Sequence, residues 1–105
     1  MADTLEKPLS RDEAIHRLRA LEPQLREMGI VSLYLFGSTA RDEAGSESDV
    51  DLFGDLEPGR VFGFEYFSLG GRIGDRLRRP VDFIVRQGLN ALLKDRIEAS
   101  AVQVY

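Results

Sequence analysis

Two aspartates, Asp49 and Asp51, are embedded among apolar residues in the sequence DVDLF. A strand directs alternate side chains to the same face, so both carboxylates leave one face if this segment is a strand. Strands disfavour aspartate, and two neighbouring carboxylates repel each other unless a cation lies between them. Hard oxygen ligands suit Mg²⁺ or Mn²⁺. The pair therefore predicts a divalent-metal site; the alternative is turn or cap residues at the start of a strand.

A third aspartate, Asp82, lies inside the apolar stretch VDFIV. If its strand neighbours that of Asp49 and Asp51, three carboxylates share one edge and can hold two divalent ions. Such a site serves in-line displacement at phosphorus, because one ion activates the attacking oxygen and the other stabilises the leaving oxygen. We therefore expect all three aspartates to be catalytic residues and metal ligands. The alternative for Asp82 is a solvent-facing residue on an edge strand.

A phosphate-binding segment is predicted upstream, where LFGST passes from apolar residues to a glycine and a serine. Gly37 lets the backbone approach a ligand closely, and the Ser38 hydroxyl and amides at a helix start donate to phosphate oxygens. Arg41, one helical turn on, adds a charge-assisted contact. The alternative for Arg41 is an exposed ion pair of little energetic value with Asp42, Glu43 or Glu47.

The hydrophobic pattern predicts the elements that must position these residues. A capping-box pattern starts a first helix at Ser10, with Pro23 as a kink and Gly29 as its end. The segments that follow are a strand over 30–36, a short helix over 39–43, a loop over 44–48 and a strand that begins near Asp49 and ends at Gly54.

The second half of the chain continues the alternation of helices and strands. We expect a glycine-rich helix over 62–77, a strand over 81–85, a helix over 89–97 and an edge strand over 102–105. The aromatic residues of the first of these helices are expected mainly in the core, with some of them left for a partner surface: Phe62, Phe64, Tyr66 and Phe67. A run of arginines on the same helix is expected to face solvent, the alternative being a local basic patch: Arg72, Arg76 and Arg79, with Arg78 beside them.

This alternation predicts an α/β (α+β) fold with a small mixed β-sheet flanked by helices. The connection between the first two strands is about a dozen residues with barely one helical turn, which is marginal for a parallel crossover. We therefore expect those two strands to be antiparallel.

Length and composition fit one domain over 1–105. The chain has 105 residues, no cysteine and a net charge of −4. That charge argues against stable nucleic-acid binding through phosphate contacts alone. We expect a cytoplasmic protein that does not enter the membrane, because the sequence has neither a signal-peptide pattern nor an apolar run of membrane-spanning length.

The sequence contains Gly-Ser followed by ten residues and then Asp-x-Asp. This pattern resembles the signature of the DNA polymerase β-type nucleotidyltransferases. GSTARDEAGSESDVDL is similar to the form in minimal nucleotidyltransferases (MNT), often the antitoxin of HEPN/MNT toxin–antitoxin pairs. The resemblance implies that Asp49, Asp51 and Asp82 bind metal. It also implies that Gly37 and Ser38 contact the triphosphate, and Ser48 matches as well. Two positions depart from the pattern: Thr39 replaces a common arginine and Asp42 a common glycine, which predicts weaker phosphate binding.

The resemblance implies a Mg²⁺-dependent transferase, with two ions, that moves AMP from ATP onto an acceptor hydroxyl. The implied acceptor is a tyrosine of a HEPN-domain toxin, so we expect a hetero-oligomer, with Asp82 activating the hydroxyl. Two alternatives stay open: an antitoxin that neutralises the toxin by binding alone, and a nucleotidyltransferase that modifies a small molecule. The chain is too short to supply walls for a small-molecule acceptor, which disfavours the last.

Overall fold

The computed structural model describes residues 8–46 and 48–105, in which four strands form one mixed sheet of order β3-β2-β1-β4. The strands are β1 (Ile30–Phe36), β2 (Val50–Leu56), β3 (Val81–Val85) and β4 (Val102–Gln103). β1 is antiparallel to β2 and to β4, whereas β2 and β3 are parallel. The predicted mixed sheet and its antiparallel first pair are confirmed, and the strand of Asp82 does neighbour the strand of Asp51.

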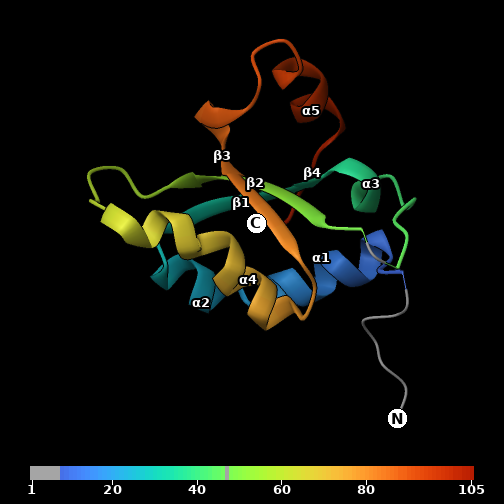
Figure 1. The fold of residues 1–105 in the computed structure, drawn as a ribbon, viewed down its shortest axis with the longest axis horizontal. Coiled ribbons are helices and arrows are strands. Elements are labelled where there is room, and N and C mark those ends of the chain that lie inside the picture. The colour runs from blue at the N-terminus through green and yellow to red at the C-terminus, as the bar shows by residue number, and fades with distance from the viewer. Residues whose placement is uncertain (1–7, 47) are drawn as a thin grey trace.

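Helices lie on both sides of this sheet. α1 (Arg11–Ala20), α2 (Glu22–Glu27) and α4 (Leu69–Leu77) cover one face, and α5 (Lys94–Ser100) lies over the other (Figure 1). The Ser10 side chain accepts a hydrogen bond from the Glu13 amide at 3.1 Å, as the capping-box pattern predicts. The expected first helix is interrupted at Leu21, and α2 begins there with Pro23 in its first turn.

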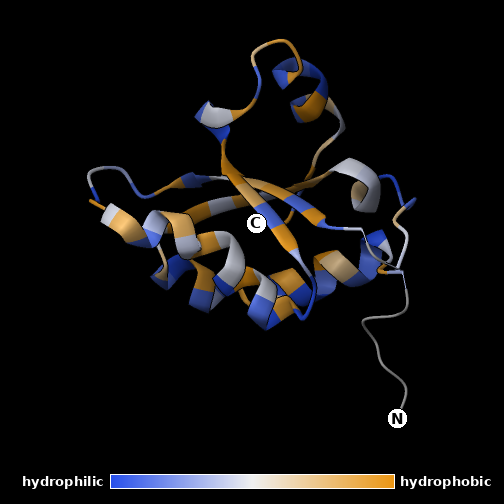
Figure 2. Cartoon of the chain, in the orientation of Figure 1, coloured by the Kyte–Doolittle hydropathy of each residue, from blue (hydrophilic) through white to orange (hydrophobic). Residues whose placement is uncertain are grey.

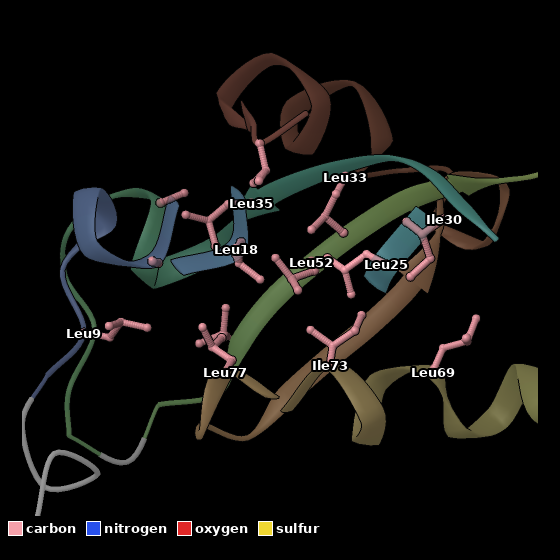
Figure 3. Packing of buried hydrophobic residues seen from close by; sticks show 14 of the residues in the cluster. Leu9, Leu18, Leu25, Ile30, Leu33, Leu35, Leu52, Leu69, Ile73 and Leu77 are labelled. Carbon is pink, nitrogen blue, oxygen red and sulfur yellow. The ribbon is translucent and has the colours of Figure 1, made fainter. Parts of the chain in front are cut away.

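The hydrophobic core fills the space between the sheet and α1, α2 and α4. Leu33 and Leu35 of β1 and Leu52 of β2 are fully buried against Leu18 of α1 and Ile73 of α4 (Figure 3). Figure 2 shows largely orange strands and helices that mix orange with blue, the pattern of a sheet covered by amphipathic helices. Because Val50 and Leu52 face this core, the alternate residues of β2 face the side of α5.

The glycine-rich segment departs from the predicted helix over 62–77. It forms a 3₁₀ helix, η2 (Gly63–Ser68), before α4 begins, and Gly63 has a positive φ of 56°. Tyr66 packs against the core as expected, but Phe64 and Phe67 are 92% and 81% exposed, so their predicted burial is wrong. The tighter 3₁₀ turn shifts the helical phase, which turns these two rings outward.

The arginine run also departs from its prediction at one residue. Arg72 and Arg76 lie on α4, but Arg79 is only 6% exposed. Arg78 adopts a left-handed conformation with φ of 65° and ends the helix, so Arg79 no longer follows the helical spacing that placed it in solvent.

Several element boundaries differ from the sequence-based expectation, among them the end of β4, which ends at Gln103. α3 spans Gly37–Ala40 and so begins at the glycine itself. β2 continues through Gly54, where a Cβ atom would lie 2.5 Å from the Ser32 carbonyl oxygen, so this glycine permits close strand contact rather than ending the strand. The last helix starts late because η3 (Arg86–Gly88) and a turn capped by Asn90 precede it, with the Leu92 amide donating to Asn90 Oδ1 at 2.8 Å. No helix in the described ranges is long and apolar enough to cross a membrane.

Candidate active site

The register of the parallel β2–β3 pair brings two of the predicted aspartates together. Asp51 and Asp82 are Cα partners on adjacent strands, which lie about 4.8 Å apart in a sheet. Asp49 immediately precedes β2 and is exposed, as is Asp82, whereas Asp51 is half-buried. Asp51 and Asp82 are each the second residue of their strand, β2 and β3. The fold therefore sets these two carboxylates side by side although they are 31 residues apart in the sequence, and Asp49 lies two residues before Asp51.

The electrostatics of Asp51 link these carboxylates to one another. Burial raises the pKa of the Asp51 carboxyl above its ordinary value, and the negative charges of Asp82 and Asp49 raise that pKa further. Arg41 acts in the opposite direction and lowers the same pKa. Three residues singled out in the sequence, Asp49, Asp82 and Arg41, therefore act electrostatically on a fourth, Asp51.

Gly37 is pressed against this site by the pairing of β1 with β2. Phe36 is the register partner of Asp51, so the residue that follows Phe36 lies beside the Asp51 carboxylate. A Cβ atom at position 37 would overlap an Asp51 carboxylate oxygen and lie 3.0 Å from its carbon. Gly37 also has φ of +75°, a conformation that other residues rarely adopt. Glycine is therefore required here on two independent grounds.

The remaining predicted phosphate contacts take different positions. Ser38 is half-buried on α3, one residue beyond Gly37. Arg41 Nε forms an exposed ion pair with Glu43 at 3.0 Å, which is the alternative raised for it, while its charge still acts on Asp51. The Ser48 hydroxyl accepts a hydrogen bond from the Gly45 amide at 2.9 Å, so in this structure it shapes the loop before β2. Glu47, another suggested partner of Arg41, lies outside the described residues.

The two departures from the family pattern have structural explanations. Asp42 adopts φ of 61°, a conformation that favours the glycine of the pattern it resembles, and its Oδ1 accepts a hydrogen bond from the Arg11 amide at 2.9 Å. Thr39 is 1% exposed, and its hydroxyl has no hydrogen-bond partner within residues 8–46 and 48–105. Its side chain therefore points into the protein and offers nothing to a phosphate.

The donor chemistry of the site fits a hard divalent cation. The aspartates supply only oxygen ligands, and Asp51 and Asp82 are register partners on adjacent strands. In the described part of the chain, no group of three histidine, aspartate or glutamate side chains lies close enough together to hold a metal ion. The strand register brings two candidate ligands together, Asp51 and Asp82.

Sequence reasoning missed a second charged group on the same side of the sheet. Asp55 lies four residues after Asp51 on β2, and Arg86 lies four residues after Asp82. Arg86 donates to both Asp55 carboxylate oxygens, each at 2.9 Å, and its guanidinium lies over the ring of Tyr34 at 4.7 Å. The equal four-residue offset was the available signal, but it has meaning only once β2 and β3 are known to be parallel and in register.

Comparisons with known proteins agree with this geometry. The family model described as a nucleotidyltransferase domain matches residues 18–104. Over 86 residues the chain is 31% identical to the "Putative protein adenylyltransferase" of Methanocaldococcus jannaschii, covering 82% of this chain and 91% of that protein. The solved "Structure of putative minimal nucleotidyltransferase" is 28% identical with a TM-score of 0.73, covering 89% of this chain and 94% of that chain.

A more distant structure shares the fold. It comes from a complex of tri-AMPylated Shewanella oneidensis HEPN toxin with MNT antitoxin, with a TM-score of 0.61 at 15% identity. The similarity covers 90% of this chain and 71% of that chain. Since the family model covers most of the chain and a 31% identical relative covers 82% of it, this protein belongs to the nucleotidyltransferase domain family and is an enzyme of that class.

Proposed function

We propose that this nucleotidyltransferase moves AMP from ATP onto a hydroxyl of a partner protein, with Mg²⁺ or Mn²⁺ bound by Asp49, Asp51 and Asp82. The acceptor is a tyrosine of a HEPN-type toxin, and the chain acts as the antitoxin. The observation that carries this proposal is the pairing of Asp51 with Asp82 directly beside Gly37. It places acidic ligands next to a backbone that a phosphate can approach closely.

The reaction is an in-line displacement at the α-phosphorus of the nucleotide. The acceptor oxygen forms a bond to this phosphorus, the bond from phosphorus to the bridging oxygen breaks, and pyrophosphate leaves. The hydroxyl proton passes to a carboxylate, and Asp82 is our candidate because it is exposed at the site. Divalent ions, when bound, would supply charge stabilisation for the attacking and leaving oxygens.

The chain's own residues orient the nucleotide. The Gly37 backbone admits the phosphates beside Asp51, and Ser38 supplies a hydroxyl donor next to it. Arg41 contributes positive charge from the end of α3, and its ion pair with Glu43 is exposed, so the side chain can exchange partners at low energetic cost. Half-buried Asp51 is held at the centre, where its carboxylate would bind the metal.

The acceptor is assigned by similarity to proteins with known partners. A relative that is 31% identical is named for protein adenylylation, and structures of the same fold come from toxin–antitoxin complexes. One of those complexes contains a tri-AMPylated HEPN toxin, and another was solved with AMP-PNP. Together these favour a protein acceptor over a small molecule and an adenine nucleotide over the other nucleotides.

Intact-mass spectrometry tests this function. The tagged chain is isolated with the proteins that accompany it and incubated with Mg²⁺ and each nucleoside triphosphate in turn. We expect the mass of a partner protein to increase by whole AMP units when the nucleotide is ATP and to stay unchanged with the other three nucleotides. Asp51→Asn should lower the rate on the order of 1,000-fold, because a metal ligand supplies several kcal/mol of transition-state stabilisation.

The matched control is Asp12→Asn, which makes the same chemical change at an exposed aspartate of α1. It should transfer AMP at the wild-type rate. A stable complex without any mass gain would replace the enzymatic proposal with neutralisation by binding alone.

A further inference from the structure

An ion pair follows the two site aspartates along the same pair of strands. The parallel register runs from Asp51 and Asp82 to Gly54 and Val85. Asp55 comes one residue later on β2, and Arg86 directly follows β3 as the first residue of η3. Arg86 Nε and Nη2 each lie 2.9 Å from an oxygen of the Asp55 carboxylate. This two-point geometry is specific, because a planar guanidinium and a planar carboxylate must be coplanar to achieve it.

The two ends of the β2–β3 pair are electrostatically opposite. At one end, the register sets two carboxylates of like charge, Asp51 and Asp82, side by side, where they repel each other. At the other end, hydrogen bonds from Arg86 lower the pKa of Asp55, which is the signature of attraction. β3 is an edge strand, held on one side by β2 alone, so these side-chain forces bear directly on its position.

Arg86 is itself fixed by further contacts. Its guanidinium lies 4.7 Å from the Tyr34 ring centre and 5.2 Å from that of Phe53, and these two rings stack at 4.8 Å. Ser32 donates to Asp55, and Arg86 Nη1 lies 3.4 Å from a Glu98 oxygen on α5. One side chain therefore connects β1, β2, the end of β3 and α5.

From these contacts we infer that Arg86 is a positioning residue for the metal site: its two-point pair with Asp55 holds β3 in register with β2, so that Asp82 stays opposite Asp51 despite their repulsion. Arg86 is not placed on the substrate or the metal. This inference rests on the proposed function in assigning the aspartates to metal binding, but the register that it explains is a property of the protein alone.

Mn²⁺ titration of the purified chain, followed by the electron paramagnetic resonance signal of free Mn²⁺, gives the first test. Arg86→Met removes the charge and keeps an apolar stem. Loss of a positive charge alone would leave the site more negative and tighten cation binding. Loss of positioning should instead weaken Mn²⁺ binding about 10-fold, the size of effect seen when outer residues that orient metal ligands are removed.

The matched control is Arg26→Met. Arg26 makes the same two kinds of contact, an ion pair with Glu22 at 2.6 Å and a ring contact with Tyr105 at 4.8 Å, but it lies on α2 rather than beside the site strands. It should bind Mn²⁺ as the wild type does. Equal or tighter Mn²⁺ binding by Arg86→Met would overturn the inference and leave the proposed function intact.

Failure of the wild type to bind Mn²⁺ would count against the proposed function. Amide hydrogen exchange, measured without metal, tests the inference about Arg86 in that case too. In Arg86→Met we expect amides of the β2–β3 ladder to exchange about 10-fold faster relative to amides of the β1–β2 ladder. Arg26→Met should leave that ratio unchanged. Equal acceleration of both ladders in Arg86→Met would mean that Arg86 stabilises the fold generally, and the inference would be wrong.

Discussion

Thr39 shows how a single residue can look functional in the sequence and be structural in the fold. It stands within GSTAR, beside residues assigned to the phosphates, at a position where similar sequences carry arginine. Its side chain is nevertheless buried, and its hydroxyl makes no hydrogen bond in the part of the chain that is described. A buried hydroxyl without a partner destabilises the folded state, because the hydroxyl loses its bonds to water.

We therefore predict that Thr39→Val stabilises the protein by about 1 kcal/mol, since valine keeps the shape and removes the unpaired hydroxyl. Nucleotide transfer should be unchanged. Urea denaturation gives the free energy of unfolding, and the transfer assay gives the rate. A loss of stability would show that the hydroxyl has a partner, and a loss of activity would show that it reaches the nucleotide. Ser38→Ala is the matched control, expected to lower activity with little change in stability.

Among the secondary-structure elements, the edge strand β4 and the two residues after it pair with β1. β4 is short, and three backbone hydrogen bonds that join Leu33 to Val104 and Tyr105 continue its pairing with β1. The Tyr105 hydroxyl donates to the Ile30 carbonyl oxygen at 2.8 Å, and the Arg26 guanidinium lies over its ring. The Tyr105 side chain therefore connects the segment after β4 to β1 and α2.

Tyr105→Phe is expected to lower the free energy of unfolding by about 1 kcal/mol at neutral pH, because the Ile30 carbonyl loses its donor. Burial raises the pKa of Tyr105 to about 12 from an ordinary 10. Between these values the unfolded chain releases the proton and the folded chain retains it, so wild-type stability falls as the pH rises from 10 towards 12.

The difference between wild type and Tyr105→Phe should therefore shrink across that alkaline range. Urea denaturation at a series of pH values measures it, and Tyr66→Phe, whose ring packs against the core, is the matched control. A constant difference from neutral to alkaline pH would contradict the assignment of the raised pKa to Tyr105.

At the level of the whole molecule, the candidate active site lowers the stability of the folded state. Val50 and Leu52 of β2 face a dry core, while Asp51 between them turns to the opposite face, where other carboxylates surround it. The folded state therefore disfavours the charged form of Asp51, which the unfolded chain accepts in water. Functional sites commonly destabilise the folds that contain them in this way.

Asp51→Asn should thus raise the melting temperature at pH 7 in metal-free buffer while abolishing transfer. The pKa of Asp51 is raised on folding, so the stability linked to its proton is present at acid pH and is lost as the pH rises through that pKa. The advantage of the asparagine variant should accordingly disappear below about pH 4, where the wild-type carboxyl is also neutral. Thermal unfolding across the pH range measures this.

Asp12→Asn should gain no stability at pH 7, since Asp12 is exposed at the start of α1. A lower melting temperature for Asp51→Asn, or an advantage that persists at acid pH, would show that Asp51 is not under electrostatic strain.

Much of the fold followed from local pattern. Strand and helix periodicity predicted the four strands and the capped first helix, and the short connection after Phe36 correctly predicted an antiparallel first pair. The failures lay where local rules compete. Phe64 and Phe67 fit a helical stripe, but the 3₁₀ geometry of η2 turns them outward, and the left-handed Arg78 takes Arg79 out of its predicted phase. Periodicity cannot anticipate a change of phase.

The chemical groups available to this protein can be read directly from its residues: three carboxylates, a glycine-serine turn and the signature that joins them. Side-chain type and spacing along a strand are local properties. Which of these groups act on each other depends instead on how the strands pair. The strand register sets Asp82 opposite Asp51, the β1–β2 pairing sets Gly37 against it, and the parallel strands bring Arg86 to Asp55. Register depends on the packing of the whole sheet, and no short stretch of sequence contains it.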